Sequence, residues 1–211
     1  LRTPLVTIKA AATSLRSGAV GWDTEARNDL LAALEEEADR LNQLVGELLN
    51  MSRIEAGALK LQRQWNILSE IVDTTINQMQ AQLRDHQLEI EVSEELPLIP
   101  VDPVLLQQVL ANLLSNCLKY APKGTVIRLT AHTQAGSSML IQMTNQGPPV
   151  LPEHLDHIFD KFHRVTAAEQ IPGTGLGLSI CKGIIEAHGG HIWAENLSDG
   201  FAFKFELPLI I

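Results

Sequence analysis

The chain has 211 residues, 45% of them hydrophobic, and a formal net charge of -9 at pH 7. A chain of this length can bury one sizeable core, or one core and a smaller helical unit. Its acidic excess, with no run rich in Lys or Arg, argues against a nucleic-acid-binding surface. We therefore expect a protein that does not bind nucleic acid.

The cysteine content and the distribution of apolar residues indicate which cellular compartment the chain is expected to occupy. Cys117 and Cys181 are too few for a disulfide framework and lack metal-ligand spacing, so they are expected to be small buried residues in a reducing environment. No apolar run approaches the roughly 20 residues that span a bilayer, and the N-terminus does not resemble a signal peptide. We expect a soluble, cytoplasmic chain, attached to a membrane only through segments outside it.

Residues 1–60 have the pattern of a helical hairpin. A short helix is expected over 6–16 and a long amphipathic helix over 24–56. The long helix has a coiled-coil-like seam with alternating spacings of four and three, formed by Leu34, Ala38, Leu41, Val45, Leu48 and Ser52. Because two helices bury too little alone, we expect a homodimer that forms a four-helix bundle. Packing of the hairpin on its own C-terminal domain is the alternative.

Residues 61–211 mix helices and strands without strict βαβ alternation, which predicts an α+β fold with a two-layer α/β sandwich. Asp102 and Pro103 provide an N-cap and a first-turn proline for a helix that ends near Tyr120. Further helices are expected over 68–85, 153–162 and 176–188, and strands over 88–92, 125–132, 139–144, 191–194 and 201–207.

The segment LLQQVLANLLSNCLKYAP, residues 105–122, carries a candidate site. Asn112 and Asn116 lie one turn apart on a largely apolar helix, where an unpaired amide costs about 1 to 3 kcal/mol. Their oxygens could bind Mg²⁺, Lys119 could meet a phosphate and Tyr120 could lie on a base. Alternatively, the amides bond a neighbouring loop and Lys119 complements the helix C-terminus. The helix alone does not decide between these interpretations.

A second candidate is GTGLGLSI, residues 173–180. A Gly-rich turn that opens a helix can direct backbone N–H groups at an anion. The alternative is a tight turn whose glycines only allow close packing, and an isolated turn of this kind does not distinguish the two.

Together, these segments resemble one family. LRTPL, NLLSNCLKYAPKG, NQGPP, HIFDKFHR, GTGLGLSICKGIIEAHGG and HIWAEN occur in the order found in bacterial sensor histidine kinases, nearest the potassium-sensing KdpD-type subgroup. The resemblance covers essentially the whole chain. It implies a dimerisation and phosphoacceptor hairpin over 1–60 and an ATP-binding domain over 61–211, with the sandwich fold of gyrase-type and Hsp90-type ATPases.

The resemblance also implies roles for individual residues. Asn116 would chelate Mg²⁺ with support from Asn112, Lys119 would contact the phosphates and Tyr120 the adenine. Arg164 would reach the phosphates beside a short lid over 165–172. The other residues implied to bind ATP are Asn145, Gly147, Phe162, Gly173, Thr174, Gly175, Leu176 and Gly177.

Two departures from the family pattern bear on function. The family holds adenine with an Asp in a DxGxG loop, but this chain has Asn145 there, whose oxygen lacks the charge-assisted part of the bond. Pro149 replaces a glycine, which fixes φ and removes an N–H. The phosphoacceptor His would precede Leu1, so we expect this chain to be a piece of a longer protein. Thr3, which in related kinases positions a water for dephosphorylation of the response regulator, is present.

The function implied is that of a sensor histidine kinase core in a two-component system. It would transfer the γ-phosphoryl group of Mg-ATP to a histidine and then to an aspartate of a response regulator receiver domain, with Asn116, Lys119 and Arg164 neutralising phosphate charge. One alternative is a degenerate kinase that signals as a dimeric interaction module. Another, a free-standing ATPase of the gyrase or Hsp90 type, is disfavoured by the hairpin and LRTPL.

Overall fold

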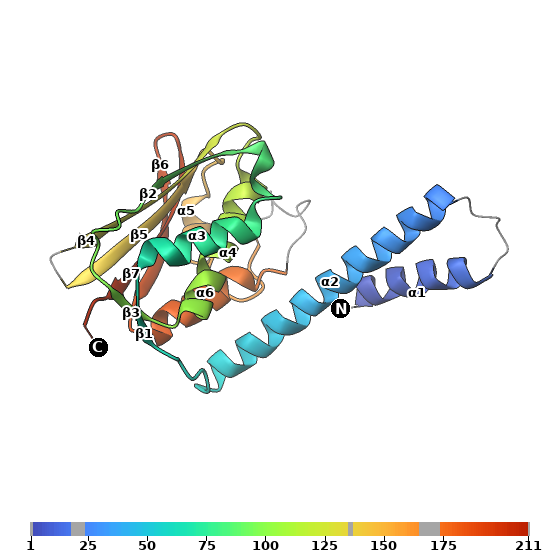
Figure 1. Cartoon of the computed structure of the whole chain (residues 1–211), viewed down its shortest axis with the longest axis horizontal. Coiled ribbons are helices and arrows are strands. Elements are labelled where there is room, and N and C mark those ends of the chain that lie inside the picture. Colours follow the sequence, from blue (N-terminus) through green and yellow to red (C-terminus); the bar gives the residue numbers. More distant parts are fainter. Residues whose placement is uncertain (1, 18–23, 135–136, 165–173, 211) are drawn as a thin grey trace. The chain divides into compact units, whose positions relative to one another are not determined.

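The structure is a computed structural model that describes residues 2–17, 24–134, 137–164 and 174–210 (Figure 1). The chain forms two compact units, Leu1–Ser52 and Arg53–Ile211. Within the described residues, no helix is both long enough and apolar enough to cross a bilayer.

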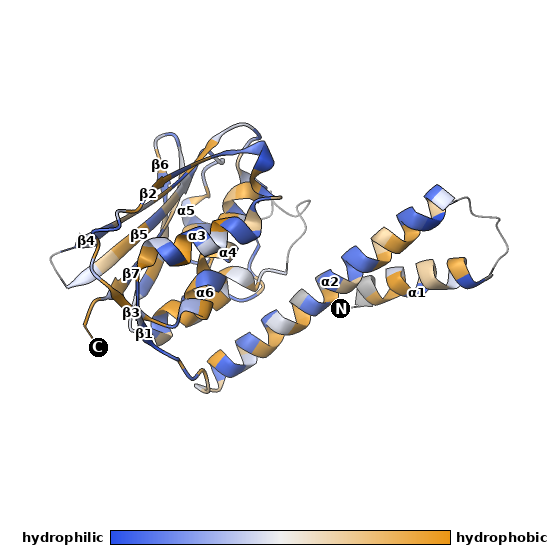
Figure 2. Cartoon of the chain, in the orientation of Figure 1, coloured by the Kyte–Doolittle hydropathy of each residue, from blue (hydrophilic) through white to orange (hydrophobic). Residues whose placement is uncertain are grey.

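The first unit is a helical hairpin, as predicted. Helix α1 spans Arg2–Ser17 and helix α2 spans Thr24–Glu55, so the last residues of α2 belong to the second unit. Figure 2 shows hydrophobic and hydrophilic residues interleaved along both helices. Several large apolar side chains of the hairpin are 38% to 62% exposed: Leu5, Val6, Leu31, Val45, Leu48 and Leu49. The hairpin therefore leaves apolar surface uncovered within this chain.

The second unit is built on a mixed five-stranded sheet of order β2-β4-β5-β7-β6. The strands are β2 Gln87–Glu91, β4 Val126–Gln134, β5 Ser138–Asn145, β6 His191–Leu197 and β7 Gly200–Pro208. Strands β2 and β4 are parallel, whereas the other neighbouring pairs are antiparallel. A separate two-stranded sheet pairs β1, Gln64–Asn66, with β3, Ile99–Val101.

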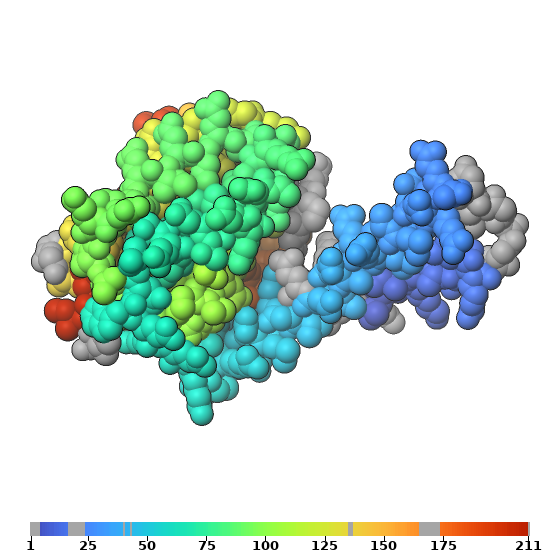
Figure 3. Space-filling view, viewed as in Figure 1, coloured from blue at the N-terminus to red at the C-terminus, as the bar shows by residue number. Residues whose placement is uncertain are grey.

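Three helices pack on one face of the five-stranded sheet: α3 Leu68–Met79, α4 Pro103–Tyr120 and α6 Gly177–Ala187 (Figure 1). Residues of α3 contribute to the surface on this side (Figure 3). The core between the layers is apolar and includes Leu110, Leu113, Ile127, Ile141, Ile180 and Phe205. Burial of these side chains stabilises the sandwich at about 25 cal/mol per Å² of apolar surface. The predicted α+β two-layer fold is confirmed.

Several predicted boundaries are wrong. The helix expected over 68–85 ends at Met79 and is followed by a 3-10 turn, η1, over Leu83–Asp85. The helix expected over 153–162 is only the single turn α5, Pro152–Leu155, after which the backbone forms turns. Strands β1 and β3 were not predicted, because three residues are too few to show a period of two.

Candidate functional site

Helix α4 positions the first group of candidate residues. Asp102 caps its N-terminus, since one carboxylate oxygen accepts from the N–H groups of Val104 and Leu105 at 3.1 and 3.2 Å. Six residues of one helix face are buried against the sheet and the neighbouring helices: Leu106, Val109, Leu110, Leu113, Leu114 and Cys117. The apolar face fixes the rotation of the helix, so Asn112 and Asn116 are half-buried beside it.

The two asparagine amides have a defined orientation. The side-chain nitrogen of Asn116 donates to the carbonyl oxygen of Asn112 at 2.8 Å, and that of Asn112 donates to the carbonyl oxygen of Gly177 at 3.4 Å. A carbonyl oxygen only accepts, so each amide must direct its nitrogen at the backbone. The side-chain oxygens of both residues are then the groups directed elsewhere. Two amide oxygens one helical turn apart are suitable ligands for a hard cation.

Lys119 and Tyr120 continue this helix toward its C-terminus. Lys119 is exposed and Tyr120 is 38% exposed, so both side chains are accessible to a ligand. The carbonyl oxygen of Tyr120 lies close to Gly147, where an added Cβ would approach it to 3.1 Å. The C-terminal end of α4 is therefore in contact with the turn that follows β5.

The last residue of β5 and the turn that follows it contain the predicted base-binding residues. Asn145 is only 5% exposed, and its side-chain oxygen accepts from the backbone N–H of Gly147 at 2.7 Å. A Cβ on Gly147 would lie 2.6 Å from that oxygen, which explains why glycine occupies the position. Pro149 is exposed in the segment that follows.

The Gly-rich turn opens helix α6. The hydroxyl oxygen of Thr174 accepts from the N–H of Leu176 at 3.1 Å, and the Leu176 side chain is 2% exposed. Gly175 has a φ of 73°, a conformation that glycine adopts without strain. Gly177 is the first residue of α6, and a Cβ added to it would lie 3.8 Å from the side-chain amide of Asn112. The structure thus places the N-terminus of an eleven-residue helix beside Asn112 of α4.

The residues around the predicted lid are described only in part. Phe159 is 7% exposed, Phe162 is 66% exposed and Arg164 is exposed. Residues 165–173, and with them the predicted lid and Gly173, lie outside the described residues. Thr3 lies within α1, but its side chain is likewise outside what the structure describes.

Both cysteines lie beside candidate asparagines, a relationship that sequence reasoning missed. Burial raises the pKa of Cys117 to about 12, and a hydrogen bond from Asn145 acts in the opposite direction. Burial also raises the pKa of Cys181 to about 12, opposed by a hydrogen bond from Asn112. The thiols are therefore protonated and serve as partners for amide N–H groups. Sequence reasoning had predicted their burial, but no spacing rule connects Cys117 with Asn145 or Cys181 with Asn112.

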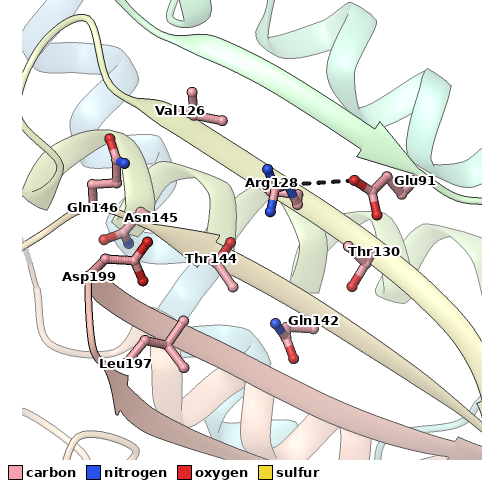
Figure 4. Close-up of a pocket in the computed structure, with 10 residues that line it drawn as sticks. All are labelled: Glu91, Val126, Arg128, Thr130, Gln142, Thr144, Asn145, Gln146, Leu197 and Asp199. Atoms are coloured by element: carbon pink, nitrogen blue, oxygen red, sulfur yellow. Dashed lines mark ion pairs between the residues drawn. The ribbon is translucent and has the colours of Figure 1, made fainter.

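A cavity of about 270 Å³ lies on the sheet face opposite the helices, with Asn145 and Gln146 among the residues at its edge (Figure 4). Its wall includes Arg128, which forms ion pairs with Glu89 at 2.7 Å and Glu91 at 3.6 Å. Ion pairs between exposed side chains contribute little, typically below about 1 kcal/mol. Because Arg128, the one basic residue among the described residues of its wall, is already paired with carboxylates, this cavity is a weaker candidate for a phosphate group than the junction of α4, α6 and the 145–147 turn.

Two family descriptions match the chain. Residues 101–211 match the histidine kinase-, DNA gyrase B-, and HSP90-like ATPases. Residues 1–57 match the His Kinase A (phospho-acceptor) domain. The candidate residues of α4, of the 145–147 turn and of the 174–177 turn all lie within the ATPase match.

Individual proteins show the same similarity. The chain is 31% identical over 211 residues to the sensor protein KdpD of Clostridium acetobutylicum, and 38% identical over 167 residues to the sensor protein KdpD of Escherichia coli K12. These matches cover 99% and 79% of this chain, but the chain spans only 23% and 18% of those relatives. The solved Acinetobacter baumannii histidine kinase AdeS has a TM-score of 0.81 at 21% identity, over 100% of this chain and 97% of that one. At that identity, the likeness supports the fold alone.

Proposed function

The chain belongs to the sensor histidine kinases, and from this premise we propose that it is the core that transfers a phosphoryl group from a nucleoside triphosphate to a histidine. The group would then pass to an aspartate of a response regulator receiver domain. A homodimer formed through the hairpin would bring two kinase cores together. In the longer protein, a membrane would be reached only through segments outside this chain.

One observation carries the proposal. The side-chain nitrogens of Asn112 and Asn116 donate to backbone carbonyl oxygens, so their side-chain oxygens are directed elsewhere, and Asn112 lies beside the N-terminus of α6. A helix N-terminus carries unpaired N–H groups and a partial positive charge, both of which favour phosphate. Amide oxygens favour a cation, and a triphosphate bound with a divalent cation needs both kinds of group within reach.

The cation suited to this arrangement is Mg²⁺. Among the described residues, no group of three His, Cys, Asp or Glu side chains is placed to hold a metal ion. Mg²⁺ fits such a site because it takes one or two protein oxygens and fills its other positions with water and phosphate. We assign Asn116 as its main protein ligand, with Asn112 in support; when bound, the ion would neutralise phosphate charge.

The other side chains have complementary roles. Lys119 and Arg164 would neutralise further phosphate charge, and the backbone of 174–177 would contact the phosphates. Tyr120 and Phe162 would contact the nucleotide through their rings, while Asn145 and Gly147 would border the base. Thr3 would act in dephosphorylation of the response regulator.

Two alternatives are not retained. A degenerate interaction module is not favoured, because both the phosphoacceptor and the ATPase descriptions match. A free-standing ATPase of the gyrase or Hsp90 type does not account for the match over residues 1–57.

The test is phosphorylation of a chain lengthened by His-Asp before Leu1, with a nucleoside triphosphate labelled in its γ-phosphate. We expect acid-labile label on the added histidine, and its transfer to a receiver domain. The same chain with Asn116→Ala is expected to stay unlabelled. If the lengthened chain incorporates no label and binds no nucleotide in calorimetry, the kinase proposal is wrong.

A further inference from the structure

The side-chain amide of Asn145 has a defined orientation. The side-chain oxygen of Asn145 accepts from the N–H of Gly147 at 2.7 Å. The two residues are in close contact, since a Cβ added to Gly147 would lie 2.6 Å from that oxygen. A backbone N–H only donates, so reversing the amide would set two donors against each other. The buried turn therefore holds the Asn145 oxygen toward itself and directs the NH₂ group elsewhere.

The NH₂ group has two hydrogens. One lies within hydrogen-bonding reach of the buried Cys117 thiol on α4. No other hydrogen bond from this nitrogen is found among the described residues, so the second hydrogen would be available to a group bound beside the turn. An aspartate at this position would offer a second oxygen there instead, which only accepts. Asn145 and an aspartate of the same shape thus present opposite hydrogen-bonding character to a ligand.

The place where the 145–147 turn contacts α4 indicates which part of a nucleotide Asn145 would meet. The proposed cation and phosphate groups would lie beside Asn112 and the start of α6, which are in contact. The 145–147 turn instead contacts Tyr120. Tyr120 lies eight residues after Asn112 on α4, which corresponds to about 12 Å along the helix axis. A triphosphate at the first end would place the base at the second.

We propose that this site prefers a purine nucleotide with a 6-oxo group, such as inosine or guanosine triphosphate, over one with a 6-amino group. The inference rests on the proposed nucleotide-binding function. Asn145 is its specificity-determining residue.

The chemistry at position 6 gives the direction of the preference. A 6-oxo group accepts the N–H of Asn145, whereas the 6-amino group of adenine is a donor that would face another donor. A buried donor without an acceptor costs about 1 to 3 kcal/mol, and about 1.4 kcal/mol is tenfold in affinity. We therefore expect a preference of about tenfold for the 6-oxo base.

The experiment compares dissociation constants by calorimetry for Mg²⁺ complexes of ATP, inosine triphosphate and guanosine triphosphate. Inosine triphosphate isolates position 6 and its associated N1 proton, and guanosine triphosphate tests whether a 2-amino group also fits. The parent chain should bind inosine triphosphate about tenfold more tightly than ATP. Asn145→Asp, which still accepts from Gly147, should reverse the order in favour of ATP.

Gln146→Glu is the matched control, because it adds the same charge one residue away on an exposed side chain. It should retain the parent's order of affinities. A parent that binds ATP more tightly than inosine triphosphate overturns the base preference while leaving the proposed kinase function in place. A parent and an Asn145→Asp variant that bind none of the three nucleotides overturn both proposals.

Discussion

The backbone N–H of Phe162 donates to the carbonyl oxygen of Gly175 at 3.0 Å, and both residues have positive φ, 59° and 73°. A Cβ at Gly175 would lie 2.9 Å from the Cα of Phe162, so the two backbones are in direct contact. This pair joins the chain just before residues 165–173 to the Gly-rich turn just after them. It thereby fixes the distance between the two ends of the predicted lid.

The contact predicts a specific effect of Gly175→Ala. The substitution forces an L-residue into a left-handed conformation, at about 1 kcal/mol, and adds a methyl group against backbone that cannot give way. We expect a loss of about 2 to 3 kcal/mol in the free energy of unfolding by urea, and at least tenfold weaker nucleotide binding by calorimetry.

Gly124→Ala provides the control, because Gly124 has a similar φ of 79° but nothing within 4 Å of an added Cβ. It should cost only about 1 kcal/mol and leave nucleotide affinity unchanged. Equal effects of the two substitutions would show that the Phe162 contact has no role of its own.

The exposed apolar residues of the hairpin predict a dimer. Leu48 is 38% exposed and Leu41 is half-buried in a single chain, although both belong to the predicted seam of α2. Leu41→Glu together with Leu48→Glu would place two charges in the dimer interface, so we expect dissociation to monomers. Light scattering at micromolar concentration should report a dimer for the parent chain and a monomer for this variant.

Asn28→Glu together with Asn42→Glu adds the same charge to α2 at exposed positions outside the seam. This control should remain dimeric. A monomeric parent chain would falsify the four-helix bundle.

The sequence predicts those parts of the fold that carry a long periodic signal. The predicted bounds of α2, α4 and α6 lie within one residue of the observed ones, because apolar spacing, the Asp102 cap and the Gly-rich start mark each helix independently. The segment 156–162 gave no comparable signal. It carries apolar residues at roughly helical spacing, but the chain forms turns there that lead to the positive φ of Phe162.

The residues of the candidate site could be predicted from the sequence, but the hydrogen bonds that orient their side chains could not. The motifs identified Asn112, Asn116 and Asn145, yet which end of each amide faces a ligand depends on partners distant in the sequence. Gly177 is 65 residues from Asn112, and no periodic pattern relates them. Amide orientation is a tertiary property, and here it determines both the proposed cation site and the proposed base preference.

His188 predicts a loss of stability in mild acid. It is 3% exposed; its Nδ1 lies 2.8 Å from the carbonyl oxygen of Ile184, and its Nε2 accepts from the N–H of Asp102 at 3.0 Å. The neutral ring satisfies both bonds, whereas protonation of Nε2 would break the second. Burial lowers the pKa of His188 below its ordinary value of 6.5, with Arg63 acting in the same direction and Ile184 and Asp102 opposing it.

At pH values between the lowered pKa of the folded chain and the ordinary pKa of the unfolded chain, the unfolded chain therefore binds a proton that the folded chain does not. The contribution of His188 to stability is complete above pH 6.5 and declines as the pH falls below it. Urea unfolding from pH 8 to 5 should show this decline in the parent chain and a weaker one in His188→Gln. The exposed His132 supplies the control, since His132→Gln should keep the parent's pH dependence.

Asn116 is the proposed main ligand of the cation. Its nitrogen bonds the Asn112 carbonyl within the same helix, at a half-buried position, so Asn116→Ala removes one modest hydrogen bond and should cost about 1 kcal/mol of stability. The same change removes the proposed Mg²⁺ ligand, so Mg²⁺-dependent nucleotide binding should be lost in calorimetry while the circular dichroism spectrum is unchanged.

Asn116→Asp should also abolish this binding. A carboxylate cannot donate to the carbonyl oxygen of Asn112 and would be repelled by it, and this repulsion would displace the side chain from the ligand position. Ser115→Ala, a polar truncation at the adjacent residue of α4, should bind as the parent does. If Asn116→Ala binds the Mg²⁺ complex of the preferred nucleotide with the parent's affinity, the cation is held elsewhere and the assignment of Asn116 is wrong.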